Sequence, residues 1–476
     1  MTFSREIEAF IKDFVKDLEE NNVAVFAGAG MSKSCGYVDW PELLRDIADE
    51  LGLKVENEHD LISLTQFHVN ERKSSAGLAK KILQEFSEQA EPSETHEILS
   101  RLPIGTYWTT NYDSLIEDAL KRAYKVADIK HSVSQLNTTR PKRDAVVYKM
   151  HGDVTVANEA VIYKQQYERY YQTHSPFVTA LSGDLVAKTF LFIGFSFTDP
   201  NLDYVLSRLY VNQPMRQHYC FLRREIVQIG DDDEVTKYKQ RKQELRVDDL
   251  KRFGIQTLLI DDYVEIPCIL KEIETRFRKK TVFISGSAEE FGNLSRQEGQ
   301  TFVHTLTAGL VREGFRVVNG FGWGIGSAVI NGALEAIYSN PEKLSEDQLV
   351  MRPFPQFASS SQDLQQLWEE YRQRMISLAG IAIFVFGNKL VDGEVVEANG
   401  VIREFEIAVQ KGVVVIPVGA TGYASKTIYE TVIDAPDKHY KGIKWVEPLV
   451  AELSNPTTPN AELVQKLVQL IKKLNK

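Results

Sequence analysis

The sequence predicts an α/β protein with two Rossmann-like parallel-sheet domains in tandem, over residues 1–279 and 280–476. In the first domain, short apolar runs alternate with helix-like runs, which is typical of a parallel sheet covered by helices on both faces. After Ile266–Lys280, which is expected to be a helix, the same alternation begins again with a glycine loop of its own. We therefore expect a second complete α/β unit, with the boundary near Arg278–Thr281.

The first element is expected to be a helix that begins after Ser4, a residue suited to helix capping. Its apolar residues fall at steps of three and four and so form one stripe. They are Ile7, Phe10, Ile11, Phe14, Val15 and Leu18. Such a stripe packs against its own domain or against another subunit, and we favour its own domain.

The other elements of the first domain follow from apolar runs bounded by glycine, proline and small polar residues. Strands are expected at Val23–Phe26, Thr106–Thr110, Ala145–Met150, Thr189–Phe195, Tyr219–Leu222 and Ile255–Ile260. Helices are expected near Pro41–Leu51, from about Asp113 and after Asp199-Pro200. The highly charged stretch Asp231–Arg246 is expected to be a solvated helix or a loop insertion.

The second domain repeats the alternation. Its strand-like runs lie in "KTVFISGS", "FRVVNG", "VMRPFPQ", "IAIFVFGNK" and "GVVVIPVG". Helical runs separate them and reach Leu310, Tyr338, Met375 and Gln410. This pattern again predicts a parallel sheet.

Composition excludes several classes of function. The 476 residues are 43% hydrophobic and 26% charged, with a net charge of -10, so a general binder of nucleic acid or of anionic membranes is not expected. The three cysteines, Cys35, Cys220 and Cys268, form no C-x-x-C pair, which excludes a four-cysteine zinc site. A sparse, odd cysteine count, no signal-like start and no bilayer-length apolar run indicate a cytoplasmic protein without a metal site.

Four strand ends of the first domain carry polar or glycine-rich segments. Ligands of open parallel sheets bind beyond the carboxyl ends of the strands, so such segments mark a candidate site. The segments are "AGAGMS" with Ala27, Gly28, Ala29, Gly30 and Ser32; "TTNYD" with Asn111 and Asp113; "HGD" with His151 and Asp153; and "GFSFTD" with Gly194, Ser196 and Asp199. Each segment alone is weak evidence, whereas four in one unit favour a ligand site.

In order and rough spacing, "GAGMSKSCG", "TTNYD" and "HGD" resemble the three signatures of the sirtuin fold, over about the first 280 residues. The resemblance implies that the first loop binds NAD, that Asn111 and Asp113 handle the nicotinamide ribose and carboxamide, and that His151 is the base. We assign catalysis to Asn111 and His151. NAD contacts are assigned to Ala27, Gly28, Ala29, Gly30, Ser32, Asp39, Asp113, Gly194, Ser196 and Asp199.

Two departures from the sirtuin pattern bear on the reaction. No cysteine pairs are present for a zinc ribbon, and Val38-Asp39-Trp40-Pro41 stands where sirtuins carry Pro-Asp-Phe-Arg. The missing ribbon argues against peptide deacylation and leaves cleavage of NAD intact, because cleavage requires only the dinucleotide and water. For Asp39 and Asp113, helix capping is an equally good interpretation.

Cleavage of the bond between ribose and nicotinamide builds positive charge on the ribose ring and releases a neutral base. Backbone N–H groups of Gly28–Ser32 are suited to hold the pyrophosphate. The uncharged Asn111 can orient hydroxyls or water without quenching the developing cation. His151 titrates near neutrality and can accept a proton from water or a ribose hydroxyl.

The second domain carries a further candidate anion site. Gly286 and Ser287 end its first strand, and Gly322 lies in "NGFGWGIGS" before a helix. Arg372 and Lys389 suit phosphates, and Glu404 suits ribose hydroxyls. This half resembles the SLOG superfamily but lacks the P-G-G-x-G-T-x-x-E element of its hydrolases. A sensor is therefore expected here in place of a second active site.

A sirtuin-like half followed by a SLOG half resembles a family of bacterial anti-phage effectors along the whole chain. The resemblance implies hydrolysis of NAD+ to ADP-ribose and nicotinamide, with NAD+ as substrate and no cofactor. It also implies activation by a cyclic ADP-ribose isomer from a TIR-domain partner protein, and a homotetramer or higher assembly. The activator site is assigned to Gly286, Ser287, Gly322, Arg372, Lys389, Gly400 and Glu404. A protein deacylase, a nucleotide phosphoribohydrolase and a non-catalytic scaffold are the alternatives.

Overall fold

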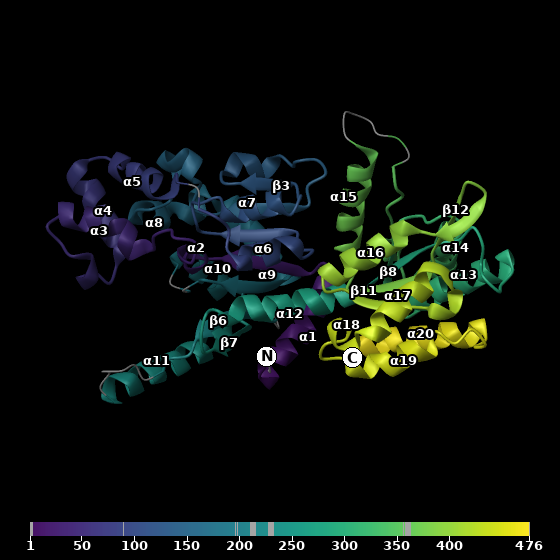
Figure 1. Ribbon diagram of the computed structural model, residues 1–476. Coiled ribbons are helices and arrows are strands. Elements are labelled where there is room, and N and C mark those ends of the chain that lie inside the picture. Colours follow the sequence, from purple (N-terminus) through teal and green to yellow (C-terminus); the bar gives the residue numbers. More distant parts are fainter. Residues whose placement is uncertain are drawn as a thin grey trace. The chain divides into compact units, whose positions relative to one another are not determined.

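The computed structural model describes residues 3–88, 90–195, 197, 199–209, 216–226, 233–355, 357 and 363–475. The chain forms two compact units, Met1–Glu274 and Thr275–Lys476, which divide within helix α12 (Glu265–Lys279). Each unit is built on a parallel sheet with helices connecting its strands (Figure 1). The predicted fold class is confirmed.

The first unit has seven parallel strands in the order β3-β4-β2-β1-β5-β6-β7. The strands are β1 (Val23–Ala27), β2 (Thr106–Thr109), β3 (Ala127–Lys130), β4 (Ala145–Lys149), β5 (Thr189–Ile193), β6 (His218–Arg223) and β7 (Ile255–Ile260). The helices are α1 (Arg5–Glu19), α2 (Ala29–Lys33), α3 (Trp40–Glu50), α4 (Leu61–Arg72), α5 (Ala76–Phe86), α6 (Glu94–Arg101), α7 (Leu115–Arg122), α8 (Lys164–Thr173), α9 (Ser175–Ala187), α10 (Pro200–Leu209), α11 (Asp233–Arg252) and α12. Short 3₁₀ turns are η1 (Val55–Asn57), η2 (Val133–Asn137) and η3 (Val154–Glu159).

Helix α1 packs against its own unit, as favoured above. The Ser4 hydroxyl accepts a hydrogen bond from the Ile7 N–H at 3.3 Å and so caps the helix. The six apolar residues of the stripe are all buried, and the Phe10 ring centroid lies 4.6 Å from that of Tyr219 on β6. The stripe is therefore covered within this chain.

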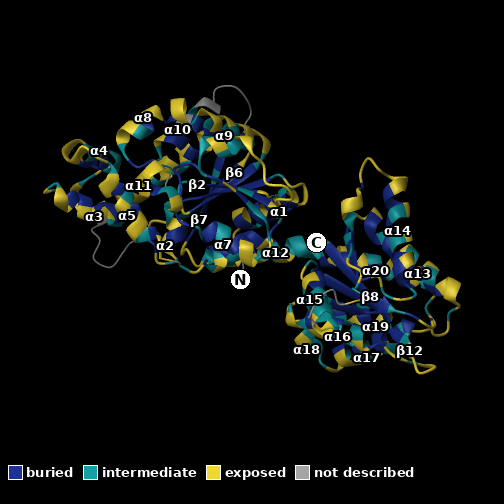
Figure 2. Cartoon of the chain, turned by 90° about the horizontal axis from the view of Figure 1, so that it is seen from above, coloured by how far each residue is buried: buried dark blue, intermediate teal, exposed yellow. Residues whose placement is uncertain are grey.

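Strand β3 was not predicted, although every expected strand of this unit is present. Its sequence, "ADIK", carries two charges in four residues, which depletes the apolar signal. In the structure Asp128 and Lys130 are both buried and form an ion pair of 2.9 Å with each other. The central strands β1 and β5, by contrast, are buried at every position, as expected for a parallel sheet covered on both faces. Figure 2 shows the sheet of this unit, around the labels β2, β6 and β7, mainly in the dark blue of buried residues.

Helix α11 contains the charged stretch that was expected to be a solvated helix or an insertion. Most of its described side chains are exposed, and its lower-numbered end follows residues that lie outside the described part of the chain. The helical interpretation is the one that the structure shows.

The second unit has five parallel strands in the order β10-β9-β8-β11-β14 and a separate antiparallel hairpin. The strands are β8 (Thr281–Ser287), β9 (Arg316–Asn319), β10 (Leu349–Met351), β11 (Ile381–Phe386), β12 (Asn388–Val391), β13 (Glu394–Glu397) and β14 (Val414–Pro417). The helices are α13 (Arg296–Arg312), α14 (Gly326–Ser339), α15 (Leu364–Ile376), α16 (Asn399–Gln410), α17 (Tyr423–Asp434), α18 (Pro436–His439), α19 (Glu447–Glu452) and α20 (Asn460–Leu474). Its 3₁₀ turns are η4 (Glu346–Gln348), η5 (Gly419–Thr421) and η6 (Lys444–Val446).

The hairpin β12–β13 is not predicted, because "IAIFVFGNK" has the apolar pattern of one continuous strand. The chain leaves β11 through Gly387 and re-enters extended structure at Asn388. Asp392 and Gly393 both have positive φ and make the tight turn, a pair that two-residue hairpin loops favour.

In the described parts of both units, every helix is too short or too polar to cross a bilayer.

Candidate functional site

The four segments singled out in the first unit all follow carboxyl ends of strands in one sheet. Strand β1 lies between β2 and β5, and β4 lies beside β2. The chain passes from one side of β1 to the other between β4 and β5, so this edge contains the topological switch point, where open α/β sheets bind ligands. The site is therefore assembled from the ends of β1, β2, β4 and β5.

The glycines after β1 and β5 allow two loops to pack backbone against backbone. The Gly28 N–H donates to the Ile193 carbonyl at 2.9 Å, and the Gly30 N–H donates to the Gly194 carbonyl at 2.9 Å. A Cβ on Gly28 would lie 2.4 Å from the Gly194 carbonyl oxygen. Gly194 has φ +63°, and a Cβ there would lie 2.3 Å from the Met31 nitrogen. Glycine is thus required at both positions by packing.

This packing changes how the first loop can hold an anion. The N–H groups of Gly28, Gly30 and Met31 all donate to protein carbonyls, Met31 to that of Gly28 at 3.0 Å. They are therefore occupied in this conformation, contrary to the simple picture of a cradle that runs from Gly28 to Ser32. Ala29 begins α2 at this point, and Ala27 ends β1 with its carbonyl accepting from the Thr109 hydroxyl at 2.9 Å.

Asn111, Ser32 and Asp113 are brought together in one hydrogen-bonded chain. The Asn111 amide donates to the Gly28 carbonyl at 3.0 Å and to the Ser32 hydroxyl at 2.8 Å. The Ser32 hydroxyl in turn donates to Asp113 Oδ2 at 2.7 Å. The buried Asp113 also accepts from the Leu115 N–H at 3.1 Å through Oδ1. Asp113 therefore accepts a hydrogen bond from the first residue of α7 and also orients the Ser32 hydroxyl that binds the Asn111 amide.

His151 lies buried at the end of β4, between α8 and α10. Its Nδ1 is 3.5 Å from the Tyr167 hydroxyl, and its Nε2 is 3.4 Å from both Asp199 Oδ2 and Asn201 Nδ2. Burial lowers the pKa of His151, and the nearby Asp199 carboxylate opposes that shift. The imidazole is therefore neutral at neutral pH, as a proton acceptor must be. A substrate that reaches Nε2 must displace the contacts from α10.

Sequence reasoning missed Tyr167 and Asn201. Both approach His151 from helices, 16 and 50 residues away along the chain. Asn201 stands two residues after Asp199, whose Oδ1 accepts from the Asn201 N–H at 2.9 Å. Tyr167 belongs to the tyrosine-rich run "YERYY", which was the available signal.

Asp39 caps a helix in the structure. Its Oδ1 accepts from the Glu42 N–H at 3.1 Å, and Glu42 accepts from the Asp39 N–H at 3.0 Å, which makes a capping box at the start of α3. Its other oxygen lies 2.5 Å from Lys33 Nζ. Burial raises the pKa of Asp39, but the bond from Lys33 and the helix N–H lower it by more. Ser196 lies outside the described residues.

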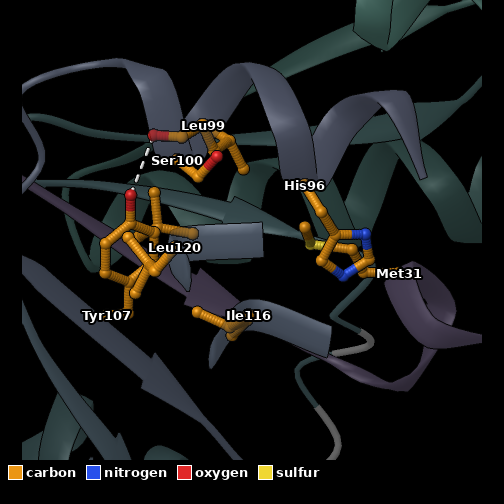
Figure 3. Close-up of a pocket in the computed structure, with 8 residues that line it drawn as sticks. Met31, His96, Leu99, Ser100, Tyr107, Ile116 and Leu120 are labelled. Carbon is orange, nitrogen blue, oxygen red and sulfur yellow. Dashed lines mark hydrogen bonds between the residues drawn. The ribbon is translucent and has the colours of Figure 1, made fainter. Parts of the chain in front are cut away.

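A small cavity lined mainly by α6 and α7 is not a nucleotide site. Its volume is about 10 Å³, enough for about one water molecule. Its lining is shown in Figure 3, where the Tyr107 hydroxyl donates to the Leu99 carbonyl at 2.8 Å. The lining residues are Val25, Met31, His96, Leu99, Ser100, Tyr107, Ile116 and Leu120.

In the second unit, Arg372 of α15 meets Gly400 and Glu404 of α16. Glu404 accepts from the Ser285 hydroxyl at 2.6 Å, and its other oxygen lies 3.8 Å from Arg372 Nε. A Cβ on Gly400 would lie 3.1 Å from Arg372 Nη2, so glycine leaves room for the guanidinium. Burial raises the pKa of Glu404 to about 7, against the opposing effects of Ser285 and Arg372.

The other four residues assigned to the activator lie around the ends of β8 and β12. A Cβ on Gly322 would lie 1.9 Å from the Gly286 carbonyl oxygen, so this glycine pair permits close backbone packing. The Ser287 hydroxyl donates to the Asn388 carbonyl at 2.9 Å. Lys389 Nζ donates to Asn399 Oδ1 at 2.8 Å, at the start of α16.

Two family models match the chain: a SIR2-like domain over residues 105–247, and the Sir2- and TIR-associating SLOG family over residues 265–474. Curated relatives match almost end to end. NAD(+) hydrolase ThsA of Bacillus cereus (strain MSX-D12) is 46% identical over 98% of both chains. The protein of that name from Cytobacillus dafuensis is 44% identical over 98% of this chain and 96% of its own. That from Acinetobacter baumannii (strain 532279) is 44% identical over 99% of both. With a sirtuin-like site on one sheet and a SLOG unit behind it in sequence, the chain belongs to the ThsA family of NAD(+) hydrolases.

Proposed function

We propose that the first unit hydrolyses NAD+ to ADP-ribose and nicotinamide, and that a cyclic ADP-ribose isomer bound by the second unit activates this reaction. The observation that carries the catalytic part is the pairing of two groups on one sheet edge. These are a neutral, buried His151 and an Asn111 side chain held by Ser32.

Each group matches a need of the reaction. The positive charge that develops on the ribose ring tolerates a neutral amide, so Asn111 can orient a hydroxyl or water without binding the cation as a carboxylate would. His151 takes the proton from water or a ribose hydroxyl. Nicotinamide leaves as a neutral base and requires no strong acid.

The activator site is proposed at Arg372, Gly400 and Glu404, with Lys389 and the end of β8 around them. A guanidinium that already lies against the first turn of α16 can be met there by a phosphate. Glu404 can accept from a ribose hydroxyl in place of Ser285. The activator must bind the active state more tightly than the resting state, since otherwise it does not shift the equilibrium between the two states.

The wider setting is also proposed. A TIR-domain partner protein makes the cyclic isomer, and the chain acts in the cytoplasm as a homotetramer or a higher assembly. Depletion of NAD+ then halts an infected cell and limits the phage. These parts are supported by membership of the ThsA family and by the match of the second unit to the Sir2- and TIR-associating SLOG family.

The test is a mass-spectrometric product assay on the purified chain with NAD+, with and without cyclic ADP-ribose isomers. His151→Ala should abolish turnover, because a general base contributes about 10²–10⁴-fold. Arg372→Ala should keep the resting rate and lose the response, whereas Arg374→Ala, on the exposed side of the same helix, should respond normally. If Arg372→Ala responds like the unchanged protein, the activator site is elsewhere.

Two alternatives have distinct outcomes in the same assay. Nicotinamide release that requires an acylated peptide would establish a protein deacylase. Release of a nucleobase from a nucleoside monophosphate that survives His151→Ala would place a phosphoribohydrolase in the second unit.

A further inference from the structure

Lys149 is a buried charge in the candidate site that the catalytic scheme above does not use. It is the last residue of β4, two residues before His151, and its side chain is fully buried. Lysine is almost never fully buried unless it is paired, because removing an ammonium from water is costly. A buried lysine at this position therefore calls for specific partners.

Four oxygens surround its ammonium. Lys149 Nζ donates to the Tyr112 carbonyl at 3.1 Å and to the Asp113 carbonyl at 2.5 Å. It also donates to Glu117 Oε1 at 3.0 Å and forms an ion pair with Asp153. Burial lowers the pKa of Lys149, but the carboxylates of Glu117 and Asp153 raise it by more, so the ammonium remains charged.

The partners come from two different loops of the site. The two carbonyls belong to the residues directly after Asn111, in the turn between β2 and α7. Asp153 belongs to the turn after β4, directly after the His151-Gly152 pair. One ammonium thus joins the segment that carries Asn111 to the segment that carries His151.

We propose that Lys149 is a positioning residue for NAD+ hydrolysis, whose ammonium holds the loop of Asn111 in register with His151. This proposal rests on the catalytic roles proposed for those two residues. Charge-assisted hydrogen bonds are shorter and stronger than neutral ones, so the ammonium holds the two carbonyls more firmly than a neutral donor would. An apolar residue would fill the same position without the desolvation cost, but it would leave both carbonyls without this donor.

A second buried lysine in the same sheet provides a matched control. Lys130 ends β3, pairs with Asp128 at 2.9 Å and donates to the Thr138 carbonyl. It has the same side chain, similar burial and a carboxylate partner, but its contacts lie within the segment of residues 128–138, which contains neither Asn111 nor His151. Lys130→Met therefore reports the general cost of losing a buried lysine.

The decisive variant removes the ammonium and neutralises its partners together. Lys149→Met alone leaves two buried carboxylates unpaired and is expected to destabilise the fold. The triple variant Lys149→Met/Glu117→Gln/Asp153→Asn removes all three charges and keeps the shapes of the two partner side chains. It leaves the two backbone carbonyls without the ammonium that binds them. It is expected to fold, as judged by its unfolding midpoint.

The experiment measures kcat and KM for nicotinamide release from NAD+, in the presence of the cyclic ADP-ribose isomers, together with amide hydrogen exchange. In the triple variant kcat should fall about 10²-fold, because a displacement of about 1 Å between reacting groups has an effect of that size. KM should change less than about threefold, since none of the substitutions lies in the loop Gly28–Ser32, and amide exchange over residues 110–115 should rise. Lys130→Met should leave kcat, KM and exchange over 110–115 near those of the unchanged protein.

A triple variant with unchanged kcat, or a Lys130→Met variant that loses as much kcat, would overturn the positioning role. Failure of the proposed function is a separate result. If the unchanged protein releases no nicotinamide, NAD+ hydrolysis is refuted, and unchanged exchange over residues 110–115 in the triple variant would then overturn the positioning role by itself.

Discussion

Gly194→Ala should distort the site, because the new methyl group clashes with the backbone of Met31. The control substitution Gly36→Ala creates no such clash. Gly194 has φ +63° and Gly36 has φ +99°, so alanine at either position adopts left-handed backbone. That conformation costs alanine about 1–2 kcal/mol. The two positions differ in their surroundings: a Cβ on Gly194 would lie 2.3 Å from the Met31 nitrogen, whereas a Cβ on Gly36 has nothing within 4 Å.

The size of the effect follows from this contact. Non-bonded heavy atoms prefer separations of about 3.5 Å, so the loops after β1 and β5 must move apart by about 1 Å. The Gly30 N–H to Gly194 carbonyl bond, 2.9 Å in the structure, would then be broken or stretched. Because the loop after β1 also fixes Asn111 through the Gly28 carbonyl, we expect kcat/KM for NAD+ to fall about 10²-fold.

The assay pairs nicotinamide release with thermal unfolding for both variants. Gly36→Ala should lose only the free energy of its backbone strain, about 1–2 kcal/mol, and retain kcat/KM within about threefold. Gly194→Ala should lose more stability and the activity as well. Equal kcat/KM values for the two variants would refute the view that contact between these loops sets the geometry of the site.

Three further predictions concern single carboxylates. Asp199→Asn should move the acidic limb of the pH–rate profile to lower pH, because the pKa of the buried His151, already lowered by burial, loses the carboxylate that opposes the shift; a limb that moves upward would contradict this. Glu404→Gln should reduce the decrease in unfolding free energy that the protein shows as pH rises from 5 to 8. A carboxyl whose pKa rises on folding from 4.5 to about 7 favours the folded state below pH 4.5 and loses that contribution as pH rises through 7, a change of about 3 kcal/mol in unfolding free energy measured with urea. Asp39→Ala should cost about 1 kcal/mol of stability through its lost cap and leave NAD+ turnover nearly unchanged; loss of turnover at unchanged stability would instead indicate contact with substrate.

The sequence predicted both sheets and the four strand ends of the site because these depend on local patterns. Continuous apolar runs mark the buried strands β1 and β5, and glycine or polar residues mark where they end. What it could not predict depends on distant contacts. Nothing local shows that Lys149, in the strand run "AVVYKM", meets carbonyls from the end of β2, or that Tyr167 reaches His151 from α8.

The glycines show the same limit of local sequence patterns, because one pattern fits two different roles. Gly28 was predicted to hold pyrophosphate, Gly194 to contact NAD and Gly322 to contact the activator. The structure shows for each of these glycines a packing reason that requires no ligand. A glycine-rich turn after a strand has the same sequence in both cases. Only the separation between the two loops in the folded chain distinguishes a cradle from a close backbone contact.

The proposed activation sets a quantitative demand on the proposed activator site around Arg372. Moving a site from about 1% to about 99% active requires an activator that binds the active state more tightly by about 5.5 kcal/mol. A charge-assisted hydrogen bond contributes about 1.5–3 kcal/mol, so about two to four such bonds made only in the active state are sufficient. Arg372, Lys389 and the first turn of α16 would be donors of that kind under the proposal, and in the structure Lys389 is bound to Asn399 while Arg372 is 3.8 Å from Glu404. Because Arg372 lies 3.8 Å from Glu404 and Lys389 is bound to a neutral amide, exchanging these contacts for phosphate contacts would supply part of the required difference in the proposed scheme.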